Sequence, residues 1–289
     1  RRQRQMCIRD SLNLLCDIVM PTPHLHQIPI LMYHSIATPA RHTPYKCLHL
    51  PYKRFAWQMA CLKRLGYTGL SMAELYPYLV GKKTGKVVGI TFDDGYHNNL
   101  AVLPILQRYR FTATNFIVSD YIGDYNRWDI PKNIPKNRLM SQDDIKQWLD
   151  AGMSIGAHTK THVNLNDCTK DVAWQQIYDC QETLTQLFGV KIDDFCYPYG
   201  QFAQQHIDYL KQLNFRTATA MYRGKADVDT LQQADSYQQD RLLSLPRVTI
   251  NNNCYAHIFL LKLLSNYENN KGKSKRKSEQ ALLDAYKAH

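Results

Sequence analysis

The sequence predicts an α/β fold in which a mainly parallel sheet, either open or closed into a barrel, is covered by helices. Segments of strand type alternate about six or seven times with segments of helical spacing along the 289 residues. Several strand segments end directly in polar or charged residues. One barrel domain commonly uses about 200–250 residues, so the length suits one such domain or two smaller ones.

Each predicted strand is a short apolar run, and most contain β-branched or aromatic residues. In chain order they are residues 28–36, 86–92, 112–119, 153–158, 194–199, 217–221 and 245–250. The predicted helices repeat apolar residues at helical spacing. They are residues 52–66, 71–79, 98–109, 141–151, 169–188, 203–214 and 256–267.

Capping residues mark several helix ends. Ser71 and Ser141 precede two helices as N-caps, and Glu74 is expected to complete a capping box with Ser71. Gly66 and Gly189 close two other helices. Two polar stretches, residues 124–138 and 225–241, interrupt the alternation. Loops of that length are usually lids, binding loops or mobile insertions.

The composition is that of a globular protein, with 44% hydrophobic and 21% charged residues, which excludes a disordered or collagen-like chain. The net charge of +11 lies mostly in two tails. Without the eight basic residues of 1–4 and 271–277, 28 basic residues face 25 acidic ones, a net charge of only +3. A basic tail can bind nucleic acid or an anionic membrane surface, or can simply be solvated.

These features predict one folded domain over residues 24–268, an uncertain leader over 1–23 and a basic tail over 269–289. The leader weakly resembles a signal peptide, but Asp17 interrupts its apolar run and no small-residue cleavage site follows. The sequence contains no run of 18 consecutive apolar residues, so it does not predict a membrane span. The eight cysteines include no C-x-x-C pair, so we expect free and mostly buried thiols.

Polar residues recur at the carboxyl ends of the predicted strands, where function sits in folds of this class. Packing alone does not explain such a recurrence. The candidates are His34, Asp93, Asp94, His158 with His162 four residues on, Tyr197, Pro198, Tyr199 and, within the last strand, Arg247.

Two of these groups suit a metal site. Asp93 and Asp94 repel each other unless a cation or shared proton intervenes, and on an extended backbone they point to opposite sides. His158 and His162 would face the same way on one helical turn. Asp94 with the two histidines suits zinc, and also iron, cobalt or nickel, while Asp93 would be the base of a metal-assisted hydrolysis. The alternatives are a strand-ending Asp-Gly turn and two surface histidines.

At this point the motifs resemble a known family. Residues 91–95 (TFDDG) and 158–162 (HTKTH) resemble the first two motifs of the polysaccharide deacetylases, the NodB-like family or carbohydrate esterase family 4. Residues 29–36 (PILMYHSI) resemble the branch that contains the poly-N-acetylglucosamine deacetylases. The resemblance runs from about residue 29 to residue 250.

The resemblance implies a deformed (β/α) barrel of about seven strands, fewer than the eight of the common barrel. It implies hydrolysis of N-acetyl groups on a polysaccharide or glycan, with release of acetate and a free amine. Asp93 matches the catalytic base. Asp94, His158 and His162 match the ligands of a divalent metal, first of all Zn²⁺, with Co²⁺ or Ni²⁺ as alternatives. The backbone N–H of Tyr199 matches the donor to the oxyanion.

The substrate contacts and two departures from the family pattern complete the prediction. Tyr197, Pro198 and the loop residue Trp128 are expected to contact substrate. The third motif commonly reads R-x-P-Y, with the arginine orienting the base, but Cys196 replaces that arginine here, and we hypothesise that Arg247 supplies the charge. The late L-x-H motif that provides the general acid is also missing. We assign that role to His34, because histidine suits proton transfer near neutral pH.

Other functions stay open on the sequence alone. The chain could hydrolyse a different amide, since a fold does not fix a substrate, or it could be a non-catalytic glycan-binding relative. We expect an N-acetylated glycan as substrate, no nucleic-acid partner, and weak association of the basic tail with membrane surfaces. Members of the family commonly act at the cell envelope or in the periplasm, although this sequence shows no credible signal peptide.

Overall fold

The computed structural model describes residues 26–39, 42 and 44–273. The predicted leader and most of the basic tail lie outside the described residues. Seven parallel strands close into a barrel in the order β2-β10-β8-β7-β6-β5-β4, and β4 pairs again with β2. These strands are β2 (Ile30–Tyr33), β4 (Val87–Phe92), β5 (Thr114–Ile117), β6 (Ser154–Ala157), β7 (Asp194–Cys196), β8 (Thr217–Arg223) and β10 (Leu245–Thr249). The prediction of a barrel of about seven strands is confirmed.

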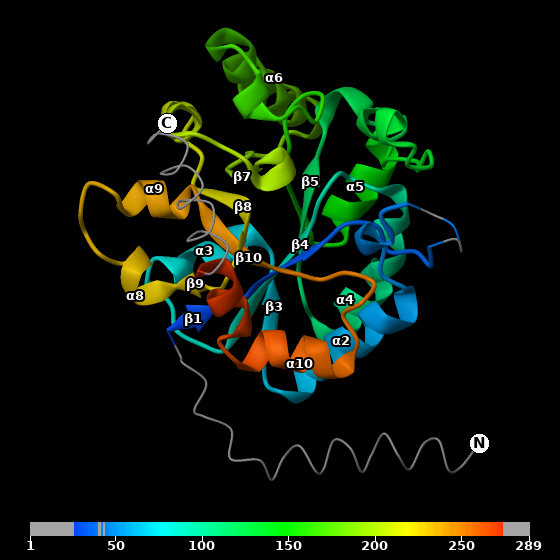
Figure 1. Ribbon diagram of the computed structural model, residues 1–289, viewed down its shortest axis with the longest axis vertical. Coiled ribbons are helices and arrows are strands. Elements are labelled where there is room, and N and C mark those ends of the chain that lie inside the picture. The colour runs from blue at the N-terminus through cyan, green and yellow to red at the C-terminus, as the bar shows by residue number, and fades with distance from the viewer. Residues whose placement is uncertain (1–25, 40–41, 43, 274–289) are drawn as a thin grey trace, which may run out of the picture.

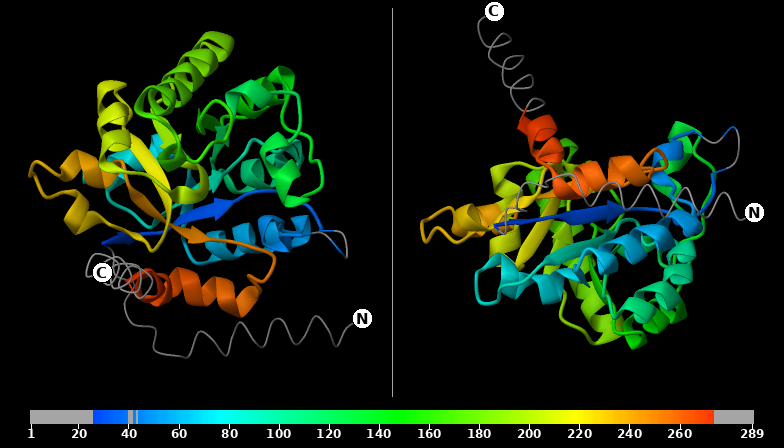
Figure 2. Two further views of the ribbon diagram at one scale, coloured as in Figure 1. Left: turned by 45° about the horizontal axis from the view of Figure 1, so that its top comes forward. Right: turned by 90° about the horizontal axis from the view of Figure 1, so that it is seen from below.

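Helices surround the barrel on its outer side (Figures 1 and 2). They are α2 (Tyr52–Arg64), α3 (Met72–Leu79), α4 (Leu103–Tyr109), α5 (Gln142–Asp150), α6 (Lys170–Phe188), α7 (Gln204–Gln212), α8 (Val228–Leu231), α9 (Gln238–Leu242) and α10 (Ala256–Leu264). Strand β3 (Thr68–Leu70), which we did not predict, pairs with the first half of β4. Four of the six cysteines in the described part are buried, and all six are free.

The predicted caps are present, with one correction. The Ser71 hydroxyl accepts the Glu74 backbone N–H, and Ser141 forms a full capping box with Asp144. Glu74 does not complete a box with Ser71, because its carboxylate instead accepts the hydroxyl of Thr112. A tertiary contact thus replaces the local one.

The two polar stretches contain more structure than we predicted. Residues 225–241 hold α8, most of α9 and β9 (Ala226–Asp227), and β9 pairs antiparallel with β1 (Gln27–Ile28). Residues 124–138 include the 3₁₀ helix η4 (Arg127–Lys132). The β1–β9 pair joins segments about two hundred residues apart, a separation that local sequence patterns do not detect.

The packed region continues beyond the predicted domain boundary at residue 268. Residues 267–273 are helical, and Glu268 is fully buried. Its carboxylate accepts two hydrogen bonds from Arg223 at 2.9 Å and pairs with Lys262 at 3.0 Å. Asn269 donates to the Gln27 side chain at 2.9 Å. Within the described ranges, no helix combines the length and apolar character needed to cross a bilayer.

Candidate active site

A cavity of about 310 Å³ opens at the carboxyl ends of the barrel strands. It gathers nine of the ten site residues predicted from the sequence, and only Pro198 is not among its lining residues. The nine are His34, Asp93, Asp94, Trp128, His158, His162, Tyr197, Tyr199 and Arg247.

Strand register brings the catalytic candidates together. Tyr33 of β2 lies opposite Phe92 of β4, so the next residues, His34 and Asp93, leave the barrel side by side. Tyr33 and Phe92 stack with ring centroids 5.4 Å apart, which anchors both strand ends in the core. In the same way, Ala157 of β6 lies opposite Phe195 of β7, which places His158 beside Cys196.

The backbone around the motifs differs from our prediction. Asp94 is not extended but lies in the left-handed region with φ of 74°, so both adjacent carboxylates line the same cavity. His158 and His162 do not share a helical turn. They sit on a loop in which Thr159 and His162 have φ of 61° and 58°. The loop, rather than a helix, makes the two imidazoles converge.

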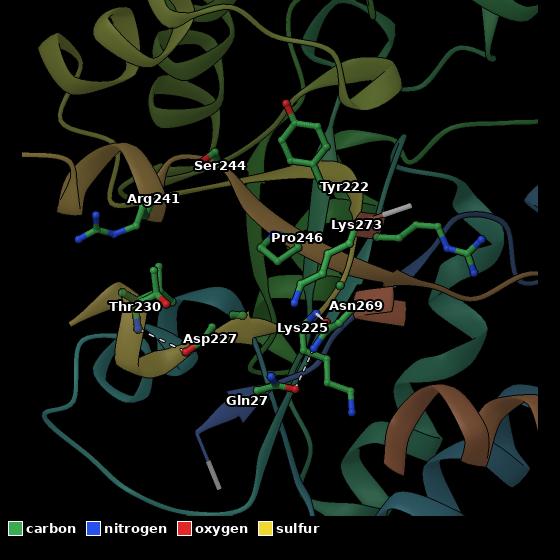
Figure 3. Close-up of a pocket in the computed structure, with 14 residues that line it drawn as sticks. Gln27, Tyr222, Lys225, Asp227, Thr230, Arg241, Ser244, Pro246, Asn269 and Lys273 are labelled. Atoms are coloured by element: carbon green, nitrogen blue, oxygen red, sulfur yellow. Dashed lines mark hydrogen bonds between the residues drawn. The ribbon is translucent and has the colours of Figure 1, made fainter. Parts of the chain in front are cut away.

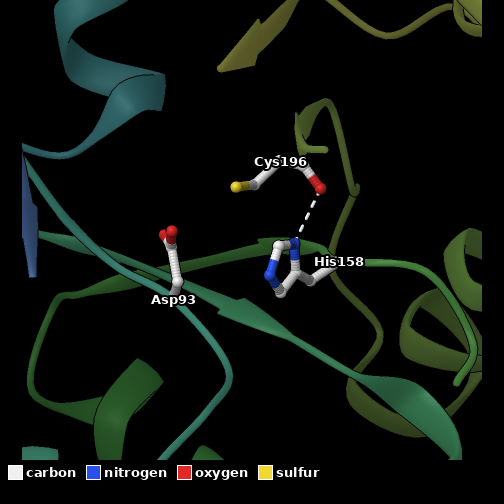
Figure 4. A group of neighbouring side chains, drawn as sticks. All are labelled: Asp93, His158 and Cys196. Carbon is white, nitrogen blue, oxygen red and sulfur yellow. Dashed lines mark hydrogen bonds between the residues drawn. The ribbon is translucent and has the colours of Figure 1, made fainter. Parts of the chain in front are cut away.

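Asp94, His158 and His162 form a compact set of metal-ligating groups. Oδ1 of Asp94 lies 3.3 Å from Nε2 of His158 and 3.2 Å from Nε2 of His162, and all three residues are buried. Nδ1 of His158 donates to the Cys196 carbonyl at 2.7 Å (Figure 4), and Nδ1 of His162 lies 3.3 Å from the Tyr199 hydroxyl. Because each Nδ1 has its own partner, each Nε2 can offer a lone pair, as metal coordination requires. The donor set therefore fits a divalent cation of the zinc type.

The buried ligands influence each other's protonation. Burial alone would raise the pKa of Asp94, but hydrogen bonds from His158 and His162 hold it well below its usual range. Burial lowers the pKa of His162, which favours the neutral imidazole that binds metals. For His158, burial is outweighed by Cys196 and by Asp94, and its pKa is raised well above the ordinary value.

Arg247 crosses from β10 to hold Asp93. Its Nη1 and Nη2 donate to the two oxygens of the Asp93 carboxylate at 2.7 and 2.8 Å, and its side chain is 1% exposed. Nε donates to the carbonyl of Ala220 at 3.2 Å, and Nη2 lies 3.2 Å from Sγ of Cys196. Burial alone would raise the pKa of Asp93, but Arg247, together with His34 and His158, outweighs burial and lowers that pKa. The guanidinium thus contacts Asp93, the residue expected to act as base, and it lies beside the cysteine that replaces the usual arginine.

A second group, Asp93, His158 and Cys196, also brings potential metal ligands within reach of one another (Figure 4). Here the guanidinium of Arg247 already contacts both the carboxylate and the thiol. A cationic side chain therefore occupies the place that a metal would take, which leaves Asp94, His158 and His162 as the better candidate for a metal site.

Comparison with known proteins decides the family. Residues 80–218 match the family model described as polysaccharide deacetylase. Over this stretch, which contains both motifs, the chain is a polysaccharide deacetylase by family. It is therefore an enzyme of the deacetylase class, as the two motifs predicted.

The alignments with individual relatives cover more of this chain than the family model does. The chain is 27% identical over 206 residues to the Bacillus subtilis protein YxkH, spanning 70% of this chain and 67% of that one. It is 23% identical over 219 residues to the poly-beta-1,6-N-acetyl-D-glucosamine N-deacetylase of Staphylococcus aureus, spanning 71% and 69%. Among solved structures, the Streptococcus pyogenes deacetylase PplD, in complex with acetate, has a TM-score of 0.69 at 25% identity and covers 84% of this chain and 99% of its own.

His34 lies at the mouth of the deacetylase cavity. Its Nε2 is 3.8 Å from Oδ2 of Asp93, and its side chain is 16% exposed, so it can meet a ligand in the cavity. Two other polar side chains near the motifs have structural contacts instead. His97 bonds Asp144 at 2.8 Å, which ties the Asp-Asp-Gly turn to α5. Tyr125 contacts Arg127 and is not among the cavity residues.

The predicted substrate contacts Trp128, Tyr197 and Pro198 differ in how they face the cavity, and Tyr199, predicted as the donor to the oxyanion, lies beside them. Trp128 lines the cavity and stacks on the His162 ring with centroids 4.4 Å apart. Tyr199 lines it from a left-handed backbone position with φ of 57°. Tyr197 is a buried part of the cavity wall, and its hydroxyl donates to the carbonyl of Leu243 at 2.9 Å. Pro198 is buried and is not among the residues that line the cavity, so the structure gives no contact in support of that prediction.

Several cavity residues of the deacetylase were missed by the sequence analysis. Asp129 and Lys132 come from η4, and Tyr45 and Met221 lie at the exposed rim. Lys132 donates to the Tyr199 hydroxyl at 3.2 Å. Neither Asp129 nor Lys132 belongs to a motif. The one signal that pointed toward them was their place in a long polar stretch after a strand.

Another cavity, of about 350 Å³, lies beside β9 and the C-terminal helical residues (Figure 3). None of the predicted site residues lines it. Two of its cationic side chains are already engaged. Lys225 donates to the carbonyls of Leu263 and Ser265 at 2.7 and 2.9 Å, and Arg241 pairs with Asp235 at 2.9 Å. This cavity therefore contains none of the residues expected to carry the deacetylase chemistry.

Proposed function

We propose that this chain is a metal-dependent N-deacetylase that hydrolyses the acetamide groups of an N-acetylated polysaccharide, with Asp93 as base. The observation that carries the proposal is one cavity in which the Asp94, His158 and His162 set lies beside an Asp93 carboxylate held by Arg247. A divalent metal held by these three ligands, Zn²⁺ first and Co²⁺ or Ni²⁺ as alternatives, would supply Lewis acidity toward the acetamide carbonyl and toward water.

In this proposal three groups of the cavity assist the reaction, two by transferring a proton and one by donating a hydrogen bond. Asp93, kept ionised by Arg247, takes a proton from the attacking water. The backbone N–H of Tyr199 donates to the carbonyl oxygen as negative charge develops on it. His34 gives a proton to the amine nitrogen as the C–N bond breaks. The products are acetate and a free amino sugar, and the acetate bound to the related PplD supports this outcome.

The substrate class rests on the relatives. The Staphylococcus aureus relative is named for its action on poly-beta-1,6-N-acetyl-D-glucosamine, so we propose a glycan of N-acetylated amino sugars. We also propose that the enzyme works at the cell envelope, where such polymers occur. A glycan fits an enzyme whose cavity is open at a rim that carries the exposed side chains of Tyr45, Tyr199 and Met221.

Metal removal tests the reaction and the site together. The purified protein with added Zn²⁺ or Co²⁺ should release acetate from N-acetylglucosamine oligomers, and a chelator should abolish release until metal is restored. Acetate is measured directly, with boiled protein as the control. Metal binding without release from any acetylated glycan would favour a different amide substrate. Failure to bind metal would contradict the ligand assignment.

The role of His34 has its own test. His34→Ala should lower kcat for acetate release by about 10²-fold or more, because the amine would leave without a positioned proton donor. Metal affinity should not change, since His34 is not in the ligand set. His257→Ala, an exposed histidine on α10, is the matched control and should keep wild-type turnover. Unchanged turnover in His34→Ala would remove the assignment.

A further inference from the structure

The two histidines of the metal set are supported in different ways. Nδ1 of His158 donates to a backbone carbonyl, that of Cys196, at 2.7 Å. This acceptor is fixed by strand β7. Nδ1 of His162 meets a side chain instead, the Tyr199 hydroxyl at 3.3 Å. For Nε2 of His162 to offer its lone pair beside Asp94, Nδ1 must carry the proton, so the phenol oxygen of Tyr199 must accept it.

A second donor fixes the same phenol oxygen. Nζ of Lys132 donates to it at 3.2 Å and lies 4.6 Å from the centre of the Tyr199 ring. Lys132 is itself held by Asp129 at 3.3 Å, and Asp129 is buried and accepts Nδ2 of Asn126 at 2.9 Å. The ammonium is therefore anchored on one side and directed at Tyr199 on the other.

The same segment also contacts the imidazole ring directly. Trp128 of η4 stacks on His162 with centroids 4.4 Å apart and an interplanar angle of 20°. The Tyr199 ring meets His162 edge-on, with centroids 4.9 Å apart and an angle of 75°. His162 is thus confined on its ring face by η4 and at Nδ1 by a phenol that η4 holds through Lys132.

We propose that Lys132 and the Tyr199 hydroxyl are positioning residues for His162, through which the η4 segment sets the affinity and geometry of the metal site. The inference rests on the proposed function, because it takes His162 as a metal ligand. Groups that support a metal-bound histidine typically change metal affinity by about 10–100-fold when removed. Because η4 forms part of the cavity wall, substrate contacts at the rim would then affect how His162 binds the metal.

Four variants of the full chain separate this role from other effects. Tyr199→Phe removes the hydroxyl but keeps the ring and the backbone N–H. Lys132→Met removes the ammonium, and Lys132→Arg restores a cationic donor. Lys136→Met is the matched control, because Lys136 lies in the same polar stretch with its Nζ over the Tyr125 ring, outside the cavity. We would measure Zn²⁺ affinity by competition with a chromophoric chelator, and the visible absorption spectrum of bound Co²⁺.

Tyr199→Phe should weaken Zn²⁺ binding by about 10–100-fold, and Lys132→Met by about tenfold, with altered Co²⁺ spectra in both. Lys132→Arg should recover most of the affinity, and Lys136→Met should match the wild type. Wild-type affinity and spectra in either Tyr199→Phe or Lys132→Met would overturn the inference, as would equal weakening in Lys136→Met. If the wild type itself bound no metal, the proposed function would fail, and the inference with it.

Discussion

Asp93→Asn should lower kcat/KM for acetate release by about 10²–10⁴-fold, the usual contribution of a general base. The amide is nearly isosteric with the carboxylate but cannot take a proton from water. Asp93 is not in the metal set, so Zn²⁺ affinity should stay close to the wild-type value. Acetate release and chelator competition on the same preparation would measure both quantities.

The matched control for this prediction is Asp194→Asn. Asp194 is also a buried carboxyl, but it lies at the start of β7, accepts the Thr217 hydroxyl at 2.6 Å and does not line the cavity. Burial raises the pKa of Asp194 to about 6, so this carboxyl is still mostly ionised at pH 7, and the amide removes a buried charge there as it does at Asp93. Wild-type kcat/KM in Asp93→Asn, or an equal loss in Asp194→Asn, would contradict the assignment of the base.

Arg247→Met should destabilise the protein by about 3–5 kcal/mol near neutral pH, the usual cost of removing one partner of a buried ion pair. The Asp93 carboxylate would stay buried without a counter-charge. The pKa of Asp93 would rise, because burial raises it and the opposing guanidinium is gone. Since the reaction needs ionised Asp93, the acidic limb of the pH–rate profile should move to higher pH.

The stability of the protein should also depend on pH through the ionisation of Asp93. A lowered pKa in the folded wild type makes Asp93 stabilising above its unfolded pKa, and this contribution is lost as the pH falls through the folded value. In Arg247→Met the folded pKa is raised, so ionisation of Asp93 destabilises the protein at neutral pH. The loss of stability in Arg247→Met relative to the wild type should therefore become smaller as the pH is lowered.

Urea unfolding at several pH values would measure the effect of Arg247→Met, with the double variant Asp93→Asn/Arg247→Met as control. The double variant removes both buried charges and should be more stable than Arg247→Met alone. Arg247→Lys keeps a charge but cannot bridge both carboxylate oxygens, so its rescue should be partial. Unchanged stability and an unchanged pH profile in Arg247→Met would rule out the orienting role.

The sequence predicted those parts of the site that adjoin strand ends. Asp93, Asp94 and His158 follow apolar strands directly, so their convergence could be predicted from the parallel order of the sheet. Arg247 was predicted from a missing charge at Cys196, and the contact with Asp93 at 2.7 Å is in agreement. The strand-end predictions succeed because apolar strands are visible in short windows of sequence, whereas Arg247 was predicted from the resemblance to a family motif in which Cys196 takes the place of an arginine.

Other features depend on contacts that no short window contains. Lys132 reaches Tyr199 across 67 positions of the chain. The polar run 225–241 folds against Gln27–Ile28 at the other end of the domain. The left-handed backbone of Asp94 is imposed by its surroundings, since aspartate tolerates that region but does not require it. Tertiary packing decides each of these, so sequence patterns alone left them out.

Because β2 and β10 close the barrel, they limit where the chain can be cut to give a stable fragment. Both strands lie outside the stretch 80–218 that matches the family model, and so do His34 and Arg247. A fragment cut to that match would expose unpaired edges on β4 and β7, which invite association with other chains. It would also keep Asp93 without its counter-charge. Deletion or fusion designs should therefore treat the ring of seven strands as indivisible.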